Sequence, residues 1–375
     1  MPVMIRTIQT AVPSTVLKQD DVRDVFAAQP DLSRLGQRLV ATSFNSADID
    51  TRYSCVSEFN TELPEPAEPM FYDRSSGLLK SPSTAERNRV YVEHAGELFI
   101  EAARKALDAC PGLEPADVTH VITVSCTGFY NPGPDYQIVR SLGLNPSTVR
   151  HHLGFMGCYA AFPALRAARD FCLADENATV LVVCVELCTL HVHSSDDPDT
   201  IMGSAIFADG AAAAVVARGG EGLQIDDLKT TLTPVGEESM AWNIGDHGFE
   251  MVLGTYVPHI IDDHITDALT PLLDADAEGP LEIGQITHWG IHPGGRAILD
   301  RIQNRLQLSE TQLYPARRIL KDYGNMSSST VLFVLKEILE AGSTGAGERV
   351  CAMAFGPGLT VETGLFTVAT VSGTS

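Results

Sequence analysis

Two residues of this chain have the types and sequence contexts of a nucleophile and its base. Cys158 follows GFMG and precedes a helical pattern, so its thiol is expected near a helix N-terminus, where unpaired backbone N–H groups favour a thiolate. His292 ends an apolar strand pattern, just before a Pro-Gly-Gly turn, and histidine is the natural base for a cysteine. Taken alone, Cys158 would more often be inert, because free cysteines are usually buried packing residues.

Asn325 is the third candidate and lies in DYGNMSSST, before another helical pattern. Its amide would serve either as a helix N-cap, the commoner role there, or as a donor to a developing oxyanion beside His292. Cys, His and Asn in this chain order are typical of papain-like proteases and of condensing enzymes with a thiolase fold. The sequence GFMGCYAAF lacks the CGSC-type context of the proteases, which favours condensation.

Alternating strand and helix patterns predict an α/β fold that positions these three side chains. Continuous apolar runs predict buried strands at 119–127, 179–187 and 211–217. Helical patterns lie at 92–110, 159–175 and 328–342. Pro163 lacks the N–H that would bond to Tyr159, so the helix after Cys158 either begins late or bends at this proline.

The glycine-rich segment 219–223 is the best candidate for a boundary between two halves of the chain. We therefore expect an N-terminal half over 1–218, which carries the cysteine, and a C-terminal half over 219–375, which carries the histidine and the asparagine.

Charge and cysteine usage exclude several classes of function. The chain of 375 residues has 26 Lys and Arg against 48 Asp and Glu, a net charge of −22 that would repel nucleic acid and anionic membrane surfaces. It has no apolar run long enough to cross a membrane and no signal-peptide pattern, so we expect a cytoplasmic protein without a membrane partner. The eight cysteines contain no CxxC pair, which favours reduced, buried thiols over disulfides or a metal site.

Longer stretches around the three candidates resemble the type III polyketide synthases, the homodimeric family of chalcone synthase and its bacterial relatives. The matching stretches run in the family's order and include SCTGFYNPGPDYQIVRSLGL, GFMGCYAAFPALRAARDF, GSAIFADGAAAAVV, WGIHPGGRAILD, YGNMSSSTVLFVL and FGPGLTVET. The resemblance implies a five-layered αβαβα thiolase fold in which both halves build one active site. It also implies a homodimeric acyltransferase that uses acyl-CoA and malonyl-CoA, without a cofactor or a metal ion.

The resemblance implies specific roles for the candidate residues. Cys158 would accept the acyl starter, and His292 with Asn325 would stabilise the enolate formed when malonyl-CoA loses CO2. Phe207 and Phe249 would be the two gatekeeping phenylalanines between a CoA tunnel and the cavity.

Seven further positions match the cavity wall of the family: Cys126, Thr127, Cys188, Leu190, His191, Gly203 and Ser327. Cys126 and Cys188 replace threonines of plant chalcone synthases, which favours a pyrone, resorcinol or similar aromatic product. His191 is an unusual polar wall residue, and we expect it to steer cyclisation.

The binding of CoA is expected to differ from that in plant members, whose basic residues lie just before the stretch DTRYS. Here that segment reads LVATSFNSADI and has no Lys or Arg. Arg38, Arg52 and Arg296 are candidates to replace those residues, and an acyl carrier protein is an alternative starter donor. The alternative activities are a single-condensation enzyme similar to ketoacyl synthase III and, from another class, a cysteine hydrolase.

Overall fold

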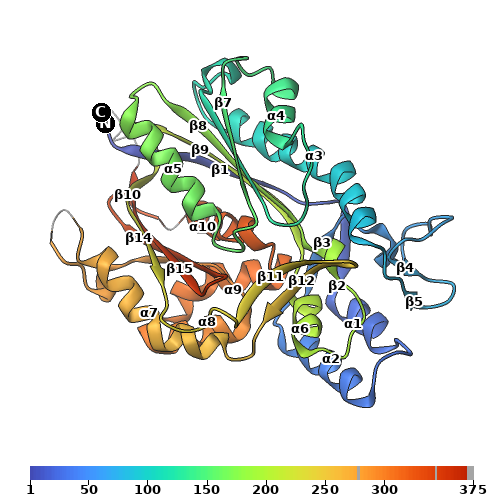
Figure 1. Ribbon diagram of the computed structural model, residues 1–375. Helices are drawn as coiled ribbons and strands as arrows, with labels where there is room; N and C mark the ends of the chain where they lie inside the picture. The colour runs from blue at the N-terminus through green and yellow to red at the C-terminus, as the bar shows by residue number, and fades with distance from the viewer. Residues whose placement is uncertain (277–278, 343, 370–375) are drawn as a thin grey trace.

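Nine strands form one central sheet in the computed structural model, which describes residues 1–276, 279–342 and 344–369 (Figure 1). The strand order is β13-β14-β15-β10-β1-β9-β8-β6-β7. The strands are β1 (Val3–Ala11), β6 (His120–Ser125), β7 (Val149–Gly154), β8 (Thr179–Leu187), β9 (Asp209–Arg218), β10 (Gly222–Leu232), β13 (His288–Ile291), β14 (Arg349–Gly356) and β15 (Thr360–Ala369). Only two residue pairs join β1 to β10, so the sheet has two halves that meet at this junction.

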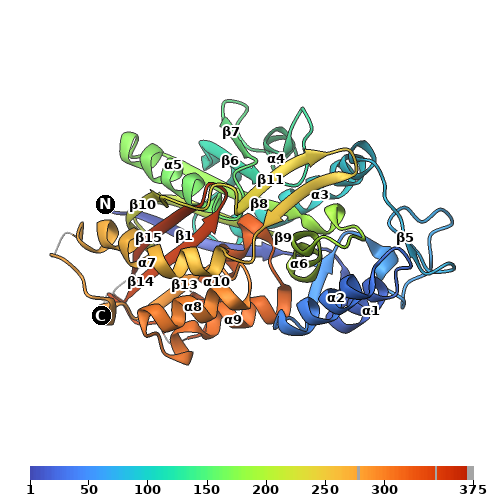
Figure 2. The same ribbon diagram turned by 60° about the horizontal axis from the view of Figure 1, so that its bottom comes forward.

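Helices cover both halves of the sheet and also fill the space between them. Their bounds are α3 (Thr84–Asp108), α4 (Pro134–Leu142), α5 (Ala161–Ala174), α7 (Val257–Leu273), α8 (Arg296–Leu306), α9 (Glu310–Tyr323) and α10 (Thr330–Glu340). Helices α5 and α10 contact strands of both halves, α3 packs on β1, β8 and β9 of the N-terminal half of the sheet, and α7 and α9 pack on β10, β13 and β15 of the C-terminal half. Figure 2 shows α7, α8 and α9 together on the side away from α4. The layers therefore run α, β, α, β, α, which confirms the predicted thiolase fold.

The predicted strands and helices of the core are confirmed, with shifts at their ends. Strands β6, β8 and β9 match the three apolar runs, and all nine residues of β8 are buried because helices cover both of its faces. Helix α3 begins eight residues before the predicted 92, because Ser83 and Glu86 form a capping box ahead of the apolar pattern. The predicted boundary at 219–223 falls between β9 and β10, and the division into 1–218 and 219–375 stays a prediction.

Smaller elements surround this core, and the sequence patterns did not predict them. The strands are β2 (Thr15–Lys18), β3 (Thr51–Ser54), β4 (Tyr72–Asp73), β5 (Leu78–Leu79), β11 (Met240–Gly245) and β12 (Gly248–Leu253), and the helices are α1 (Gln19–Ala27), α2 (Arg34–Ser46) and α6 (Pro198–Ile206). Strands β11 and β12 pair only with each other and form a hairpin outside the central sheet. No helix in the described part of the chain is both long and apolar enough to span a membrane.

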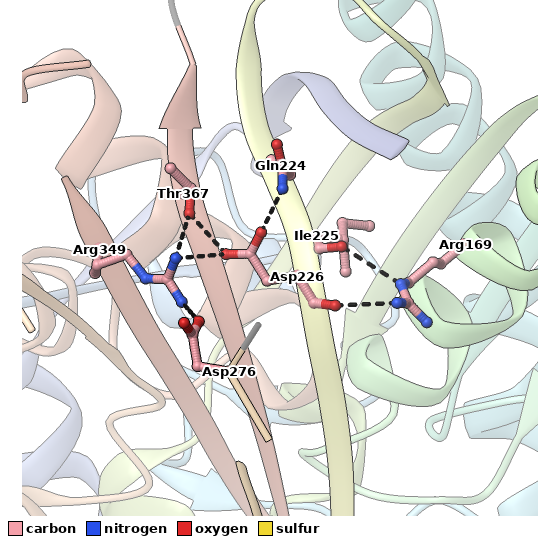
Figure 3. A network of polar contacts seen from close by, with 7 residues as sticks. All are labelled: Arg169, Gln224, Ile225, Asp226, Asp276, Arg349 and Thr367. Carbon is pink, nitrogen blue, oxygen red and sulfur yellow. Dashed lines mark hydrogen bonds and ion pairs between the residues drawn. The ribbon is translucent and has the colours of Figure 1, made fainter. Parts of the chain in front are cut away.

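A network of charged side chains connects the two halves near their junction (Figure 3). Arg169 of α5 donates to two backbone carbonyls of β10, at 3.4 and 3.0 Å. Arg349 of β14 lies between the carboxylates of Asp226 and Asp276, and Thr367 donates to Asp226 at 2.7 Å. A cavity of about 520 Å³, which we call the junction cavity, is lined by Arg169, Asp226, Asp276 and Arg349 of this network.

Candidate active site

The structure brings the three predicted reactive residues to one cavity, which we call the catalytic cavity. Cys158 lies on the turn before α5, His292 directly follows β13, and Asn325 lies between α9 and α10. The strand that carries His292 belongs to the C-terminal half and the cysteine to the N-terminal half. Both halves of the fold therefore contribute side chains to the same cavity.

A tight turn presents Cys158 ahead of helix α5. The helix begins at Ala161, so Pro163 is its third residue and lies in the first turn, where a missing N–H breaks no helical hydrogen bond. The helix thus begins late, one of the two outcomes expected from this proline. Gly157 has φ 86°, and a Cβ there would lie 2.5 Å from Cδ of Pro357, so only glycine fits this turn.

Burial keeps the thiol and the imidazole neutral when each is considered alone. It raises the pKa of Cys158 to about 11, although hydrogen bonds from Ser327 and Asn325 oppose this shift. It also lowers the pKa of His292 to about 3. Both ring nitrogens of His292 are buried without a hydrogen-bond partner among the described residues. Because an unpaired buried polar group is costly, this imidazole is suited to a proton from the thiol or to a bound substrate.

The amide of Asn325 is held in a fixed orientation beside the histidine loop. Its Oδ1 accepts from the N–H of Ser327 at 2.9 Å, and its Nδ2 donates to the carbonyl of Gly294 across 3.4 Å. The N-cap of α10 is Ser329, so the role of helix cap considered for Asn325 does not apply to that helix. The long bond to Gly294 leaves Nδ2 as a donor that a substrate oxygen can engage.

Glu186 is a buried acidic residue under the catalytic cavity that the sequence analysis missed. It is fully buried in β8 and accepts from the N–H of Cys126 at 2.9 Å and from the hydroxyl of Thr127 at 3.1 Å. The hydroxyl of Ser328 donates to its other oxygen. Burial raises its pKa to about 7. A lone acidic residue inside the apolar run of 179–187 was the signal that could have identified it.

The predicted wall residues divide between the catalytic cavity and a second pocket beside it. Cys126, Thr127, Cys188 and Ser327 line the catalytic cavity. Cys188 also lines the second pocket, together with His191 and Gly203. Leu190 is fully buried and lines neither of them.

Of the two predicted gatekeeping phenylalanines, one lines the catalytic cavity. Phe207 lines both the catalytic cavity and the second pocket, whereas Phe249 lines only the second pocket. The Phe249 ring stacks on His191 with centroids 4.2 Å apart. Met251 and Trp242 of the β11–β12 hairpin line the catalytic cavity instead. The sequence analysis missed this hairpin, because it has no continuous apolar run.

A third, mostly apolar pocket of about 170 Å³ adjoins the catalytic cavity and shares Leu253, Gly294 and Ile298 with it. Arg296 lines this pocket at the first residue of α8. Arg38 is exposed on α2, whose last turn contributes Ser43 and Ser46 to the same pocket.

The prediction that Arg52 binds CoA is wrong for a physical reason. Its side chain is buried, and its Nη1 donates to the backbone carbonyls of Ser204 and Phe207, both at 2.8 Å. A guanidinium held inside the protein in this way cannot reach a phosphate at the surface.

The fold and the cavity together define the class of protein. Both halves of the thiolase fold contribute to this cavity, and a thiol, an imidazole and an amide converge there. This is the arrangement of an acyltransferase of the condensing type. The described residues contain no group of three or more His, Cys, Asp or Glu side chains that could hold a metal ion.

Comparison with known families gives the same class and makes it specific. The family model described as "Chalcone and stilbene synthases, N-terminal domain" matches residues 2–220, and the corresponding C-terminal domain matches residues 224–370. The chain therefore belongs to the chalcone and stilbene synthase family, the type III polyketide synthases.

Individual relatives come from several kingdoms. A bisdemethoxycurcumin synthase of Oryza sativa subsp. japonica is 34% identical over 319 residues, which cover 81% of this chain and 77% of the relative. The crystal structure of PKS-I from the brown alga Ectocarpus siliculosus superposes with a TM-score of 0.90 at 29% identity and covers 98% of each chain. The 1,3,6,8-tetrahydroxynaphthalene synthase of Streptomyces coelicolor A3(2) superposes with a TM-score of 0.83 at 26% identity, covering 99% of this chain and 100% of that one.

Proposed function

We propose that this enzyme loads an acyl-CoA starter on Cys158, extends it by decarboxylative Claisen condensation with malonyl-CoA, and cyclises the product. One observation carries the proposal: the half-buried thiol of Cys158 lines the same mostly apolar cavity as the imidazole of His292, whose two ring nitrogens have no hydrogen-bond partner among the described residues. Groups left unpaired in a buried site are suited to engage a substrate.

Loading begins with transfer of the thiol proton of Cys158 to His292. Because burial penalises each charge alone, the thiolate and the imidazolium are stable only as a pair. The thiolate attacks the thioester carbonyl, the bond from carbon to CoA sulfur breaks, and the imidazolium returns its proton to the CoA thiolate. The acyl group is then held on Cys158, and His292 is neutral again.

Extension uses the neutral imidazole. Malonyl-CoA loses CO2, and the electron pair of the broken carbon–carbon bond forms a thioester enolate. An N–H of His292 and the Nδ2 of Asn325 would donate to the enolate oxygen, and apolar walls would exclude water. The enolate carbon attacks the acyl thioester, Cys158 leaves as thiolate, and the extended chain stays on CoA. The low pKa of His292 keeps the imidazole neutral for this step.

We assign the entrance for CoA to the third pocket, beside Arg296. This pocket adjoins the catalytic cavity, and the N-terminus of α8 adds backbone N–H groups that favour a phosphate. The N-cap of α8 is Gly295, which has no side chain to occupy those groups. Arg38 is the second basic candidate, from α2. An acyl carrier protein stays the alternative starter donor.

We assign the gatekeeping role to Phe207, which lines the catalytic cavity and the second pocket, with Phe249 behind it in the second pocket. The wall of the catalytic cavity is narrowed by Trp242 and carries Cys126 and Cys188 in place of threonines. These features support a compact product such as a pyrone or a resorcinol.

We further infer a homodimer from the free edge of the sheet. Strand β7 is the last strand of the sheet, and the side chains of residues 149–152 are all exposed. Phe129 and Tyr136, of the segment between β6 and β7, are 41% and 42% exposed. A partner strand on this edge would satisfy its free backbone groups and cover these rings. Light scattering of the purified protein measures the state directly, and a monomer at all concentrations would exclude the dimer.

The decisive experiment is a product assay. The purified enzyme is incubated with a panel of acyl-CoAs and labelled malonyl-CoA, and in parallel with the same starters on an acyl carrier protein. We expect labelled polyketides and CO2 release from at least one acyl-CoA. If no starter gives a malonyl-dependent product, the proposed function is excluded, whereas release of free acid without malonyl-CoA would indicate a hydrolase.

A further inference from the structure

The β11–β12 hairpin forms one wall of the catalytic cavity but belongs to no larger sheet. Met240, Trp242 and Met251 line the cavity from it. At its tip the hydroxyl of Thr84, at the start of α3, accepts from the N–H of Gly248 at 2.9 Å. The hairpin packs on α6, and polar contacts join it to α3 and to the cavity floor in place of strand pairing with the core.

His191 makes the central one of these contacts. Its Nε2–H donates to the carbonyl of Thr127 at 2.7 Å, and its Nδ1 accepts from the backbone N–H of Phe249 at 3.0 Å. Thr127 follows β6 on the cavity floor, and Phe249 lies in β12. One imidazole ring thus spans the distance from the floor to the hairpin, and both of its nitrogens are used.

Ring packing and a second hydrogen bond support the same connection. The His191 ring stacks on Phe249 at an angle of 10° and meets Trp242 edge to face, with centroids 5.9 Å apart. The indole N–H of Trp242 donates to the carbonyl of Cys126 at 2.9 Å. The floor loop of Cys126 and Thr127 is therefore joined to both strands of the hairpin.

The surroundings hold His191 in this neutral bridging form. Arg87 is fully buried and donates to the carbonyls of Leu190 and Val192, the two neighbours of His191 in the chain. Burial lowers the pKa of His191 to about 3, and the nearby charge of Arg87 acts in the same direction. A neutral ring supplies the one donor and the one acceptor that the bridge needs. No ring nitrogen is left for a substrate, so His191 does not act on the polyketide directly.

We propose that His191 is a positioning residue that sets the acyl chain length the catalytic cavity accepts, by holding the β11–β12 hairpin against the cavity floor. Cys188, Phe207, Trp242 and Met251 line both the catalytic cavity and the second pocket, so they form the wall between them. Releasing the hairpin lets this wall move and joins the two spaces. This inference rests on the proposed function, because it assumes that an acyl chain occupies the cavity.

The test compares acylation of Cys158 by acyl-CoAs of increasing chain length, measured by intact mass without malonyl-CoA. His191→Phe keeps the flat ring on Phe249 and removes both hydrogen bonds. We expect it to raise the rate ratio of long to short acyl groups about tenfold, as for a pocket that gains room for extra methylenes. His191→Asn, whose Oδ1 can take the place of Nδ1, should return the ratio part of the way to the wild-type value. In His191→Phe, hydrogen exchange of the backbone of 240–253 should also become faster.

A second variant and the wild-type product assay separate failure of this proposal from failure of the proposed function. Thr84→Val removes the side-chain hydrogen bonds of Thr84 to Gly245 and Gly248 at the tip of the hairpin, and the backbone bond from Thr84 to Asp246 remains. It should shift the ratio in the same direction by a smaller amount, which provides the test if His191→Phe does not fold. A folded His191→Phe enzyme with the wild-type ratio overturns the proposal, whatever its exchange rate. Acylation of the wild type without any malonyl-dependent product would instead count against the proposed function alone, because the ratio is measured before extension.

Discussion

The junction cavity and the catalytic cavity both collect polar side chains between the halves of the fold, yet only one is suited to chemistry. At the junction, Arg349 and Asp226 satisfy each other and Thr367, so their charges are largely used in holding strands together (Figure 3). In the catalytic cavity, His292 is buried with both nitrogens unpaired. Each site holds an unpaired buried group among the described residues, since Nε of Arg349 at the junction also lacks a hydrogen-bond partner. The difference lies in the type of group: a guanidinium stays protonated and only donates, whereas a neutral imidazole can accept a proton from a thiol. Suitability for chemistry therefore follows the acid–base properties of the unpaired group, not the volume of a cavity or its number of charges.

Removing the thiol of the catalytic cavity should have the largest effect on activity, and a substitution at the junction cavity should have none. Cys158→Ala is expected to abolish polyketide formation, a loss of about 10³-fold or more, because no acyl group can be held. Release of CO2 from malonyl-CoA should continue in part, since His292 and Asn325 remain. The measurement is product by mass together with labelled CO2. Asp226→Asn, at the junction cavity, is the matched control and should retain the wild-type rate; loss of activity there would break the comparison.

His292→Gln should then change how the thiol responds to pH. Without its partner the thiol has a pKa raised by burial to about 11. Its alkylation by iodoacetamide should be slow near neutral pH and rise about tenfold for each pH unit toward that value, because only the thiolate reacts. The wild-type enzyme should react faster at neutral pH, since His292 can accept the proton. Equal rates for both proteins across this range would exclude the ion pair.

Glu186, buried under the catalytic cavity, should make the stability of the protein depend on pH. Burial raises its pKa from 4.5 to about 7, so the folded state holds a proton that the unfolded state has released. Stability should therefore fall as pH rises between these two values, by about 3 kcal/mol in total, and then level off. Glu186→Gln carries no such charge and should lose this dependence. Urea unfolding over this pH range measures it, and parallel curves for the two proteins would contradict the prediction.

The smallest expected effect belongs to the junction. Asp226→Asn weakens the contacts to Arg349 and Thr367 and should lower the free energy of unfolding by about 1–3 kcal/mol. Asp227→Asn is the neighbouring control, because its pair with Lys229 is partly exposed and should contribute about 1 kcal/mol or less. Denaturant unfolding of both variants decides the point. If both variants lower the free energy of unfolding equally, the junction network stabilises the fold no more than a partly exposed ion pair does.

Much of the core was predictable from local patterns. The apolar runs gave β6, β8 and β9, and the position of Pro163 allowed a late start of α5. The β11–β12 hairpin was not predictable in this way, because its strands pair only with each other and carry mixed polar and apolar residues. Phe249 was predicted as a gatekeeper, and the structure stacks its ring on His191; Arg52 was a candidate to bind CoA, and the structure buries it. Each of these differences depends on contacts with residues far away in the chain.

The sequence by itself determined the chemistry this protein can perform. Cys158, His292 and Asn325, each in a turn beside a strand or helix pattern, indicate a condensing enzyme. Tertiary structure alone decided which polar atoms have partners: it paired both nitrogens of His191 and neither nitrogen of His292. The physical reason is that residue type fixes which protons and electron pairs a side chain can offer. Burial and hydrogen bonding are set by neighbours that only the folded chain brings together.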